Sequence, residues 1–367
     1  MGQLSVRALA KTRVFLFAAT AIGLAAWACA GGASAAGAAP VAGASPACTG
    51  IQTLTYSAAD QAAARDYWTT ARIRDAAGFS ASALNRTGLT YRSSADSRPL
   101  AATECMPVAG TVTSAAAFVP RAATLAATPK AATAFPSIGK LTYKADGLLD
   151  LSCTATVIQG AKVPNNEELI ATAAHCIEGT TGGIPYTSTN LAFSPMWHDN
   201  QSPLGVWTAR KVFLNSGWMH CPIPVVNCTT NPADDYAIIV LNPQNGRGVG
   251  AVTGADGWLV NQPGTISGVT IAGIPSSASQ TLVTVSDTTT VTQSGVAYRQ
   301  ATTPGFTDGS SGGPWLEHFN SATGAGVLIG DTGGFEQGGP ASGTPSYTDT
   351  WDSAFASVVA AATNFEG

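Results

Sequence analysis

Charged side chains are scarce in this chain of 367 residues. Asp, Glu, Lys and Arg make up only 11% of it, and the formal net charge is -4. There is no basic cluster that could neutralise a run of phosphates, which argues against nucleic acid as a partner. The low share of charge also argues against long charged helices, while the abundant Gly, Ala, Ser and Thr indicate a β-rich protein with many loops.

Long apolar runs are missing from the chain except near its beginning. Three basic residues precede an apolar stretch over 14–28, and Ala33-Ser34-Ala35 is a suitable cleavage site. We therefore expect residues 1–35 to be a secretory signal peptide and the protein to be secreted and extracellular, without membrane contact after the signal is removed. A membrane anchor is the weaker alternative, because a spanning helix needs about 20 apolar residues.

The cysteines lack the C-x-x-C spacing that is typical of zinc sites, so no metal is expected. All seven cysteines except Cys29 follow the signal peptide, and the remaining even number suits three disulfides in an exported protein. Many pairings are open, and the sequence alone fixes none of them. Proximity in the sequence favours a disulfide between Cys221 and Cys228. Cys153 lies on the strand before Cys176 and is placed to bridge it. Cys48 and Cys105 could close the segment between them.

Composition divides the rest of the chain into four parts. Residues 36–108 contain one helix candidate, 58–77, with Ser57 as its N-cap. We interpret this part as a pro-segment, although an accessory region that is never removed fits equally well. Residues 109–136 form a linker rich in Ala, Thr and Pro. Two β-rich parts follow, 137–246 and 247–367.

Short apolar runs separated by Gly, Pro, Asn and Ser predict strands in both β-rich parts, and no internal repeat is apparent. This pattern indicates two consecutive all-β units. The expected strands cover 138–143, 152–158, 168–173, 206–214 and 236–241 in the first unit and 268–272, 281–285, 288–292 and 326–329 in the second, which ends in a helix over 353–363.

Three segments in these units each offer one member of a catalytic set. The first, 172–176, ends a strand in small residues that leave room for the imidazole of His175. Alone, His175 fits a buried structural histidine as well as a catalytic base. The second segment places Asp235 directly before a strand, where a carboxylate is held firmly enough to orient an imidazole. Asp234, its neighbour, is the alternative.

The third segment reads Asp308-Gly309-Ser310-Ser311-Gly312-Gly313-Pro314. Acyl transfer needs a hydroxyl beside backbone N–H groups that can meet an oxyanion, and glycines let the backbone turn sharply. Ser311 is therefore the candidate nucleophile, with the N–H groups of Gly309 and Ser311 as the oxyanion hole. A turn without chemistry is the alternative reading, but the order His, Asp, Ser fits a base, an orienting group and a nucleophile.

Together, the Ala-Ala-His-Cys segment, the Asp-x-Ala-Ile strand and the Gly-x-Ser-Gly-Gly-Pro turn resemble the trypsin and chymotrypsin superfamily over about residues 137–340. The opening of that region at residues 138–141, with few disulfides, is most similar to the bacterial branch that contains glutamyl endopeptidases. The resemblance implies two six-stranded antiparallel β-barrels, with His175 and Asp235 on the first, Ser311 on the second and the site in a cleft between them. It implies a monomeric serine endopeptidase that cleaves a protein or peptide substrate through an acyl-enzyme, without a cofactor.

Several residues depart from the patterns of that family. Ser310 stands where members activated by a new N-terminus have Asp, so that amine-to-aspartate switch is absent. Gly305 stands where trypsin-like enzymes have Asp, and 328–335 contains no histidine, so neither a basic residue nor Glu is expected at the cleaved bond. By analogy with the family, the residues expected to bind or line the site for substrate are Gly305, Phe306, Thr332, Asp308 and Phe335.

Two other functions fit parts of the sequence. The segment 309–313 also fits the G-x-S-x-G elbow of α/β-hydrolases, but that fold needs a histidine late in the chain and only His318 follows Ser311. A catalytically inactive relative that keeps the barrels as a binding module is the stronger alternative. His198 and His220 lack the spacing of a metal site and are expected to be loop and packing residues.

Overall fold

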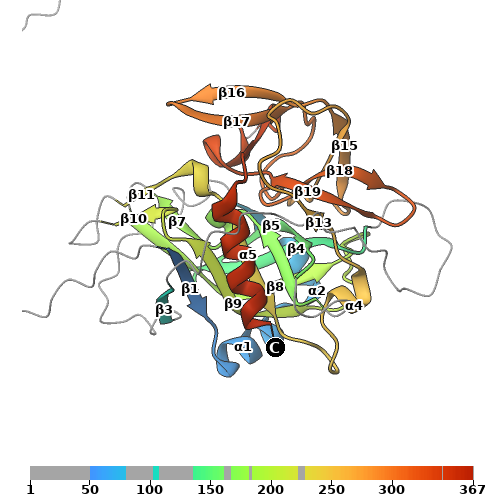
Figure 1. The fold of residues 1–367 in the computed structure, drawn as a ribbon. Helices are drawn as coiled ribbons and strands as arrows, with labels where there is room; N and C mark the ends of the chain where they lie inside the picture. The colour runs from blue at the N-terminus through green and yellow to red at the C-terminus, as the bar shows by residue number, and fades with distance from the viewer. Residues whose placement is uncertain are drawn as a thin grey trace, which may run out of the picture. The chain divides into compact units, whose positions relative to one another are not determined.

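The computed structural model describes most of the chain beyond residue 49 (Figure 1). All described residues belong to one compact unit, Ala47–Gly367. Several predicted features lie outside the described residues and remain predictions, namely the signal peptide over 1–35, most of the linker over 109–136, and the pairing of Cys48 with Cys105. The described ranges are 50–79, 102–106, 135–160, 167–181, 184–221, 228–340 and 342–366.

Six antiparallel strands close into a barrel. Their order is β9-β12-β6-β5-β4-β8, and a further pairing of β8 with β9 completes the ring, which confirms the first predicted barrel. Five of these strands coincide closely with expected ones. The sequence does not predict the sixth, β8, because Pro185 and Asn190 are residues that strands disfavour. The bounds are β4 (Ile138–Ala145), β5 (Leu149–Val157), β6 (Leu169–Thr172), β8 (Ile184–Pro195), β9 (Trp207–Asn215) and β12 (Ala237–Leu241).

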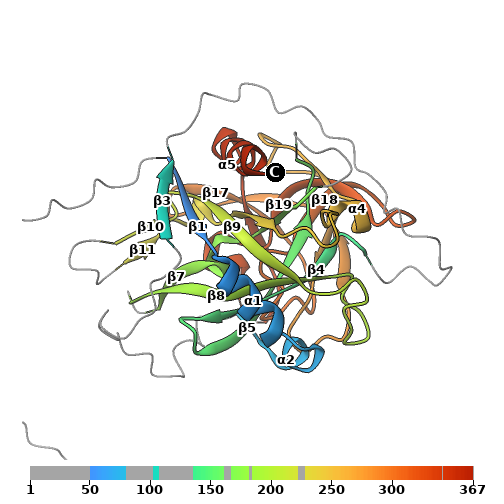
Figure 2. The same ribbon diagram turned by 90° about the horizontal axis from the view of Figure 1, so that it is seen from below.

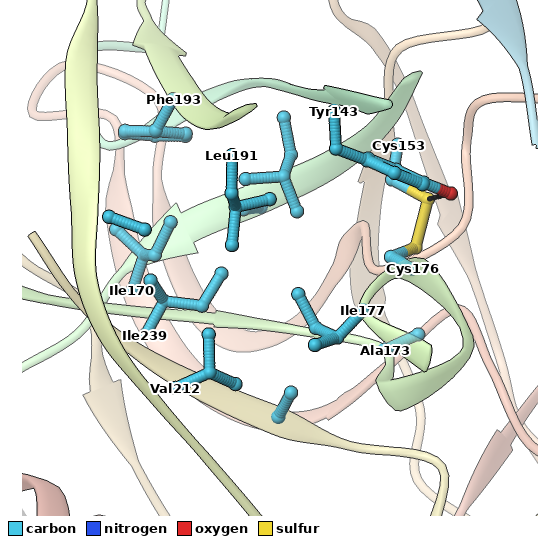
Figure 3. Close-up of a cluster of buried hydrophobic side chains, with 14 of the residues drawn as sticks. Tyr143, Cys153, Ile170, Ala173, Cys176, Ile177, Leu191, Phe193, Val212 and Ile239 are labelled. Atoms are coloured by element: carbon cyan, nitrogen blue, oxygen red, sulfur yellow. Dashed lines mark hydrogen bonds between the residues drawn. A yellow bond between two sulfur atoms is a disulfide. The ribbon is translucent and has the colours of Figure 1, made fainter. Parts of the chain in front are cut away.

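Strand β5 shows why the barrel is packed on both sides. Its alternate residues Leu151, Cys153, Ala155 and Val157 point into the apolar barrel core, part of which is shown in Figure 3. The residues between them, Ser152, Thr154 and Thr156, are polar and are also buried. Buried polar groups require hydrogen-bond partners, and the hydroxyls of Thr154 and Thr156 donate to Gly309 O and Asp256 Oδ2 in the second half of the chain.

That second half contains a five-stranded sheet and a three-stranded sheet. Among the described residues no pairing closes either sheet into a ring, so the second six-stranded barrel remains a prediction. The first sheet has the order β13 (Gly257–Trp258), β19 (Ala325–Asp331), β18 (Pro314–Asn320), β14 (Val269–Gly273) and β15 (Leu282–Ser286), and the second has β16 (Thr289–Gln293), β17 (Val296–Ala301) and β20 (Ser346–Asp349).

The C-terminal helix α5 (Ser353–Phe365) lies across the barrel strands (Figure 1) and begins as expected, with Asp352 as its N-cap. It contributes to an apolar cluster that the two halves share. The barrel provides Phe213 and Ile238, the second half provides Leu316 and Leu328, and the helix provides Phe355, Val358, Val359 and Ala362. The helix thereby fastens one half to the other.

The segment before the barrel packs against it (Figure 2). Strand β1 (Ile51–Thr55) extends the barrel sheet by pairing with β9, and β3 (Ala102–Met106) pairs with β1. The single helix expected over 58–77 is wrong, because two short helices form instead, α1 (Ala58–Tyr67) and α2 (Thr70–Asp75). The chain breaks at Trp68, whose buried indole N–H donates to Asn190 O, and Thr69 caps the second helix. Ser57 caps α1 as expected.

The remaining elements are short. None of the helices in the described ranges has the length and apolar character needed to cross a bilayer. These elements are β2 (Ala77–Gly78), β7 (Glu178–Thr181), β10 (Met219–His220), β11 (Thr229–Thr230) and α4 (Gly250–Thr253), with the 3-10 turns η1 (Ala174–Cys176), η2 (Pro232–Asp234) and η3 (Phe335–Gly338).

Candidate active site

His175 lies in the turn η1 directly after β6, and several contacts hold this turn. A disulfide joins Cys176 to Cys153 on β5 (Figure 3), and the hydroxyl of Tyr186 donates to His175 O over 2.6 Å. The backbone N–H of His175 donates to Asp235 Oδ1 at 2.9 Å. The imidazole is therefore fixed from both its own backbone and the neighbouring cysteine.

The side chains of His175 and Asp235 form a buried pair. The ring Nδ1 lies 2.8 Å from Asp235 Oδ2, and both side chains are 0% exposed. The same Oδ2 accepts a hydrogen bond of 2.8 Å from the backbone N–H of Gly334. A carboxylate in this place holds the proton on Nδ1, which leaves Nε2 as the basic nitrogen. Nε2 is buried and has no hydrogen-bond partner among the described residues.

Asp234 points elsewhere. Its two carboxylate oxygens accept hydrogen bonds of 2.7 Å from the side-chain amides of Asn215 and Asn231, and burial raises the pKa of this carboxyl. The turn η2 ends at Asp234 and β12 begins at Ala237, so Asp235 is held between two ordered elements. Of the two neighbouring acids, Asp235 is the one in contact with the imidazole.

The turn that carries Ser311 depends on its glycines. Gly309 and Gly312 adopt φ values of +102° and +76°, which favour glycine. A Cβ atom on Gly312 would overlap the Thr172 side chain, and one on Gly313 would overlap the carbonyl oxygen of Ala272. The backbone N–H groups of Gly309 and Ser311 donate to no described residue. Neither N–H group is therefore used by the fold of the described residues.

Thr154 of β5 joins the barrel to this turn. Its backbone N–H donates to Ser311 O at 2.7 Å, and its hydroxyl donates to Gly309 O at 2.9 Å. The same hydroxyl accepts a hydrogen bond of 2.8 Å from Ile274 N. All of these groups are buried. Thr154 thus fixes the two residues whose N–H groups would form an oxyanion hole. The sequence around it does not indicate this role, although Thr154 directly follows Cys153.

A hydrogen bond from Ser276 orients the peptide group between Asp308 and Gly309. Ser276 N donates to Asp308 O at 2.9 Å. Because C=O and N–H point in opposite directions across a trans peptide, the N–H of Gly309 points away from Ser276. The hydroxyl of Ser311 makes no hydrogen bond to Nε2 of His175.

No family model matches the sequence, and no curated protein matches it either. Solved structures do resemble the chain. A thermostable serine protease, AL20, from an extremophilic microorganism is 22% identical with a TM-score of 0.49, covering 63% of this chain and 98% of its own. The protease Anisep from Arthrobacter nicotinovorans has the same identity and TM-score, covering 63% and 97%. HL collagenase is 14% identical with a TM-score of 0.41, covering 64% and 95%.

The residues expected to contact substrate differ in their surroundings. Gly305 is exposed, with a φ of +86°. Phe306 is buried in an apolar cluster that includes Trp315, and the Trp315 indole N–H donates to the hydroxyl of Thr332 at 3.1 Å. The side chains of Phe306 and Thr332 are thus engaged by the protein itself. Substrate contact by these three residues remains a prediction.

Two further acids are buried near Asp235. Burial, reinforced by the negative charges of neighbouring carboxylates, raises the pKa of Asp331 and of Asp349. Both oxygens of Asp331 lack a hydrogen-bond partner among the described residues. Burial thus disfavours the charged form of both carboxyls.

The cysteines near the site do not form a metal centre. Cys153, His175 and Cys176 place ligand atoms within 4.8 Å of one another, but the two sulfur atoms are joined in a disulfide. A second disulfide joins Cys221 to Cys228, as their proximity favours. His198 is half-buried beside Asp199, and neither it nor His220 belongs to a cluster of metal ligands in the described ranges.

Proposed function

We propose that this chain is a secreted serine endopeptidase that hydrolyses peptide bonds with His175, Asp235 and Ser311. The observation that carries the proposal is the buried His175–Asp235 pair, in which Nδ1 meets the carboxylate and Nε2 has no partner among the described residues. The N–H groups of Gly309 and Ser311, which donate to no described residue, support the same reading, because acyl transfer needs donors for a developing oxyanion.

In the first half of the reaction, Ser311 Oγ attacks the carbonyl carbon of the scissile peptide bond and its proton passes to His175 Nε2. The carbonyl oxygen becomes an oxyanion, which accepts hydrogen bonds from the N–H groups of Gly309 and Ser311. Each such donor is typically worth about 3 to 4 kcal/mol. Asp235 keeps the imidazole oriented and stabilises it while it is charged.

The intermediate collapses when the C–N bond breaks and Nε2 returns the proton to the leaving amine, which leaves an acyl-enzyme on Ser311. Water then attacks the acyl carbon, His175 takes a proton from that water, and the C–O bond to Ser311 breaks as the proton returns to Oγ. The reaction consumes one water and needs no cofactor.

The remaining assignments belong to the same proposal. Secretion through a signal peptide at 1–35 is supported by the apolar N-terminal pattern and by the disulfides, as export favours them. We also propose the pro-segment over 36–108, the linker over 109–136, barrels over 137–246 and 247–367, and a monomer. Kinship with glutamyl endopeptidases rests only on the sequence around 138–141.

A fluorophosphonate probe tests the proposal, because it phosphonylates an activated serine. The full chain is incubated with the probe for hours, and the labelled residue is identified by mass spectrometry of a digest. We expect one label per chain at Ser311 and none in Ser311→Ala. The absence of any label under all conditions would favour the inactive binding module instead.

A further inference from the structure

The segment Ala76–Phe79, called here the occluding strand, lies directly against the candidate catalytic residues. Strand β2 within it pairs in parallel with β5, with Gly78 opposite Ser152. The N–H of Phe79 donates to Ser152 O at 2.9 Å, and the Ser152 hydroxyl donates to Ala77 O at 3.3 Å. Ser152 precedes the cysteine that bridges to Cys176. The occluding strand is therefore bound by its main chain next to the turn that holds His175, as an extended peptide would be.

Phe79 covers the imidazole. The centres of the Phe79 and His175 rings lie 4.7 Å apart, with 37° between their planes. Phe79 itself is buried, also against Tyr186 at 6.0 Å between ring centres. A substrate must reach Nε2 of His175 for proton transfer, and this aromatic ring contributes to the complete burial of that side chain.

Gly78 covers the candidate oxyanion donor. A Cβ atom added to Gly78 would overlap the carbonyl group of Asp308 and would lie 2.6 Å from Gly309 N. The main chain of Gly78 is thus in contact with the peptide whose N–H is proposed to bind the oxyanion. A substrate carbonyl cannot approach this N–H while Gly78 occupies the adjacent space.

Other described residues of the N-terminal segment anchor the occluding strand to the barrel. β1 is paired with β9, the Trp68 indole is buried and bonded to Asn190, and the Tyr67 hydroxyl donates to Asp150 at 2.8 Å. A tethered ligand binds intramolecularly, with an effective concentration that reaches the millimolar range for short linkers. The occluding strand can therefore compete with substrate although its own contacts are few.

We propose that the occluding strand is an intramolecular inhibitor, so that the intact chain is latent until Gly78 and Phe79 leave the site. The proposal rests on the proposed function and specifies how that site is regulated. The ligand is an extended peptide in which a glycine lies on the Asp308–Gly309 peptide and an aromatic residue lies on the imidazole. It differs from control by a new N-terminus, for which Ser310 lacks the carboxylate.

The variant Gly78→Ala in the full chain tests this. The backbone of Gly78 has no positive φ, so alanine is disfavoured there by its overlap with the Asp308–Gly309 peptide and not by strain in its own backbone. We expect the strand to leave the site. The rate of fluorophosphonate labelling at Ser311 should then rise about tenfold or more, which corresponds to a covered state that accounts for about 90% or more of the wild-type chain. Ala71→Ser, at an exposed position of α2, is the matched control and should label at the wild-type rate.

Two further measurements keep the test independent of one variant. Phe79→Ala removes the ring from His175 and should raise the labelling rate even if Gly78→Ala folds poorly. Amide hydrogen exchange reports the position of the strand without any activity, and the Phe79 N–H should be protected in the wild-type chain and exchange faster in Gly78→Ala. Faster exchange in the wild-type chain after Ser311 is labelled would support the same competition.

The outcomes separate the two proposals. Equal labelling rates in the wild-type chain, Gly78→Ala and Phe79→Ala, with one label at Ser311 in each, would overturn the inhibitor and leave the peptidase intact. No label at Ser311 in any of them would overturn both. Faster labelling in Gly78→Ala and Phe79→Ala, but not in Ala71→Ser, supports both.

Discussion

Replacing Thr154 with valine is the most informative change to the link between the barrel and the nucleophile turn. Valine has nearly the same shape, so no cavity forms, but it can neither donate to Gly309 O nor accept from Ile274 N, which are 2.9 Å and 2.8 Å from the threonine hydroxyl. Both groups remain buried without that partner. An unsatisfied buried group costs about 1 to 3 kcal/mol, so we expect the free energy of unfolding to fall by about 2 kcal/mol or more.

Urea unfolding followed by tryptophan fluorescence measures this loss. Thr154→Ser keeps the hydroxyl and should restore most of the stability. Thr142→Val is the matched control, since Thr142 is also a buried strand threonine but its hydroxyl makes one long bond, 3.4 Å, to Ala192 O. Labelling of Ser311 should slow in Thr154→Val and not in Thr142→Val. A Thr154→Val chain as stable and as quickly labelled as the Thr142→Val chain would refute the role we assign to this hydroxyl.

Three other predictions follow from the site and its supports. Asp235→Asn should slow peptide hydrolysis by about 10⁴-fold, because the imidazole loses its orienting carboxylate; if Asp234→Asn were instead the damaging change in a kinetic assay, the role would move to that residue. Burial raises the pKa of Asp256 from 3.8 to about 7, so the folded state holds this proton more tightly than the unfolded state does. The resulting stabilisation is present below about pH 4 and is lost as the pH rises to about 7. Over that range, the free energy of unfolding of the wild-type chain, measured with urea, should fall by on the order of 4 kcal/mol relative to that of Asp256→Asn. Replacing Cys153 and Cys176 together with alanine should lower the unfolding free energy by about 3 kcal/mol, since their loop spans 23 residues, and an unchanged urea midpoint would contradict that.

The local pattern of the sequence predicts much of the fold. Runs of β-branched and apolar residues identify most barrel strands, and Ser57 correctly marks a helix start. The sequence misses β18, which begins at Pro314 directly after the nucleophile turn, because proline there is typical of a loop as well as of a strand's first residue. It also misses the helix break at Trp68, which a distant carbonyl on β8 stabilises.

The candidate site is predictable where the chemistry itself constrains nearby residues. The glycines around Ser311 are required by φ angles and close approaches within one turn, so the motif is visible in the sequence. The contacts of Gly78 with Asp308 and of Phe79 with His175 join residues far apart in the chain, and neither residue has a local pattern that indicates its partner. Thr154 is not predicted for the same reason, since its partners Gly309 and Ile274 are far from it in the sequence.

The shared apolar cluster under α5 has a consequence for how the protein unfolds. Residues of the barrel, of the second half and of the helix exclude water together, so neither half buries its full apolar surface by itself. Contact between the two halves therefore contributes to the folding free energy of each half. The smallest unit that unfolds cooperatively is accordingly larger than the barrel. Separation of the halves would expose apolar core residues to water.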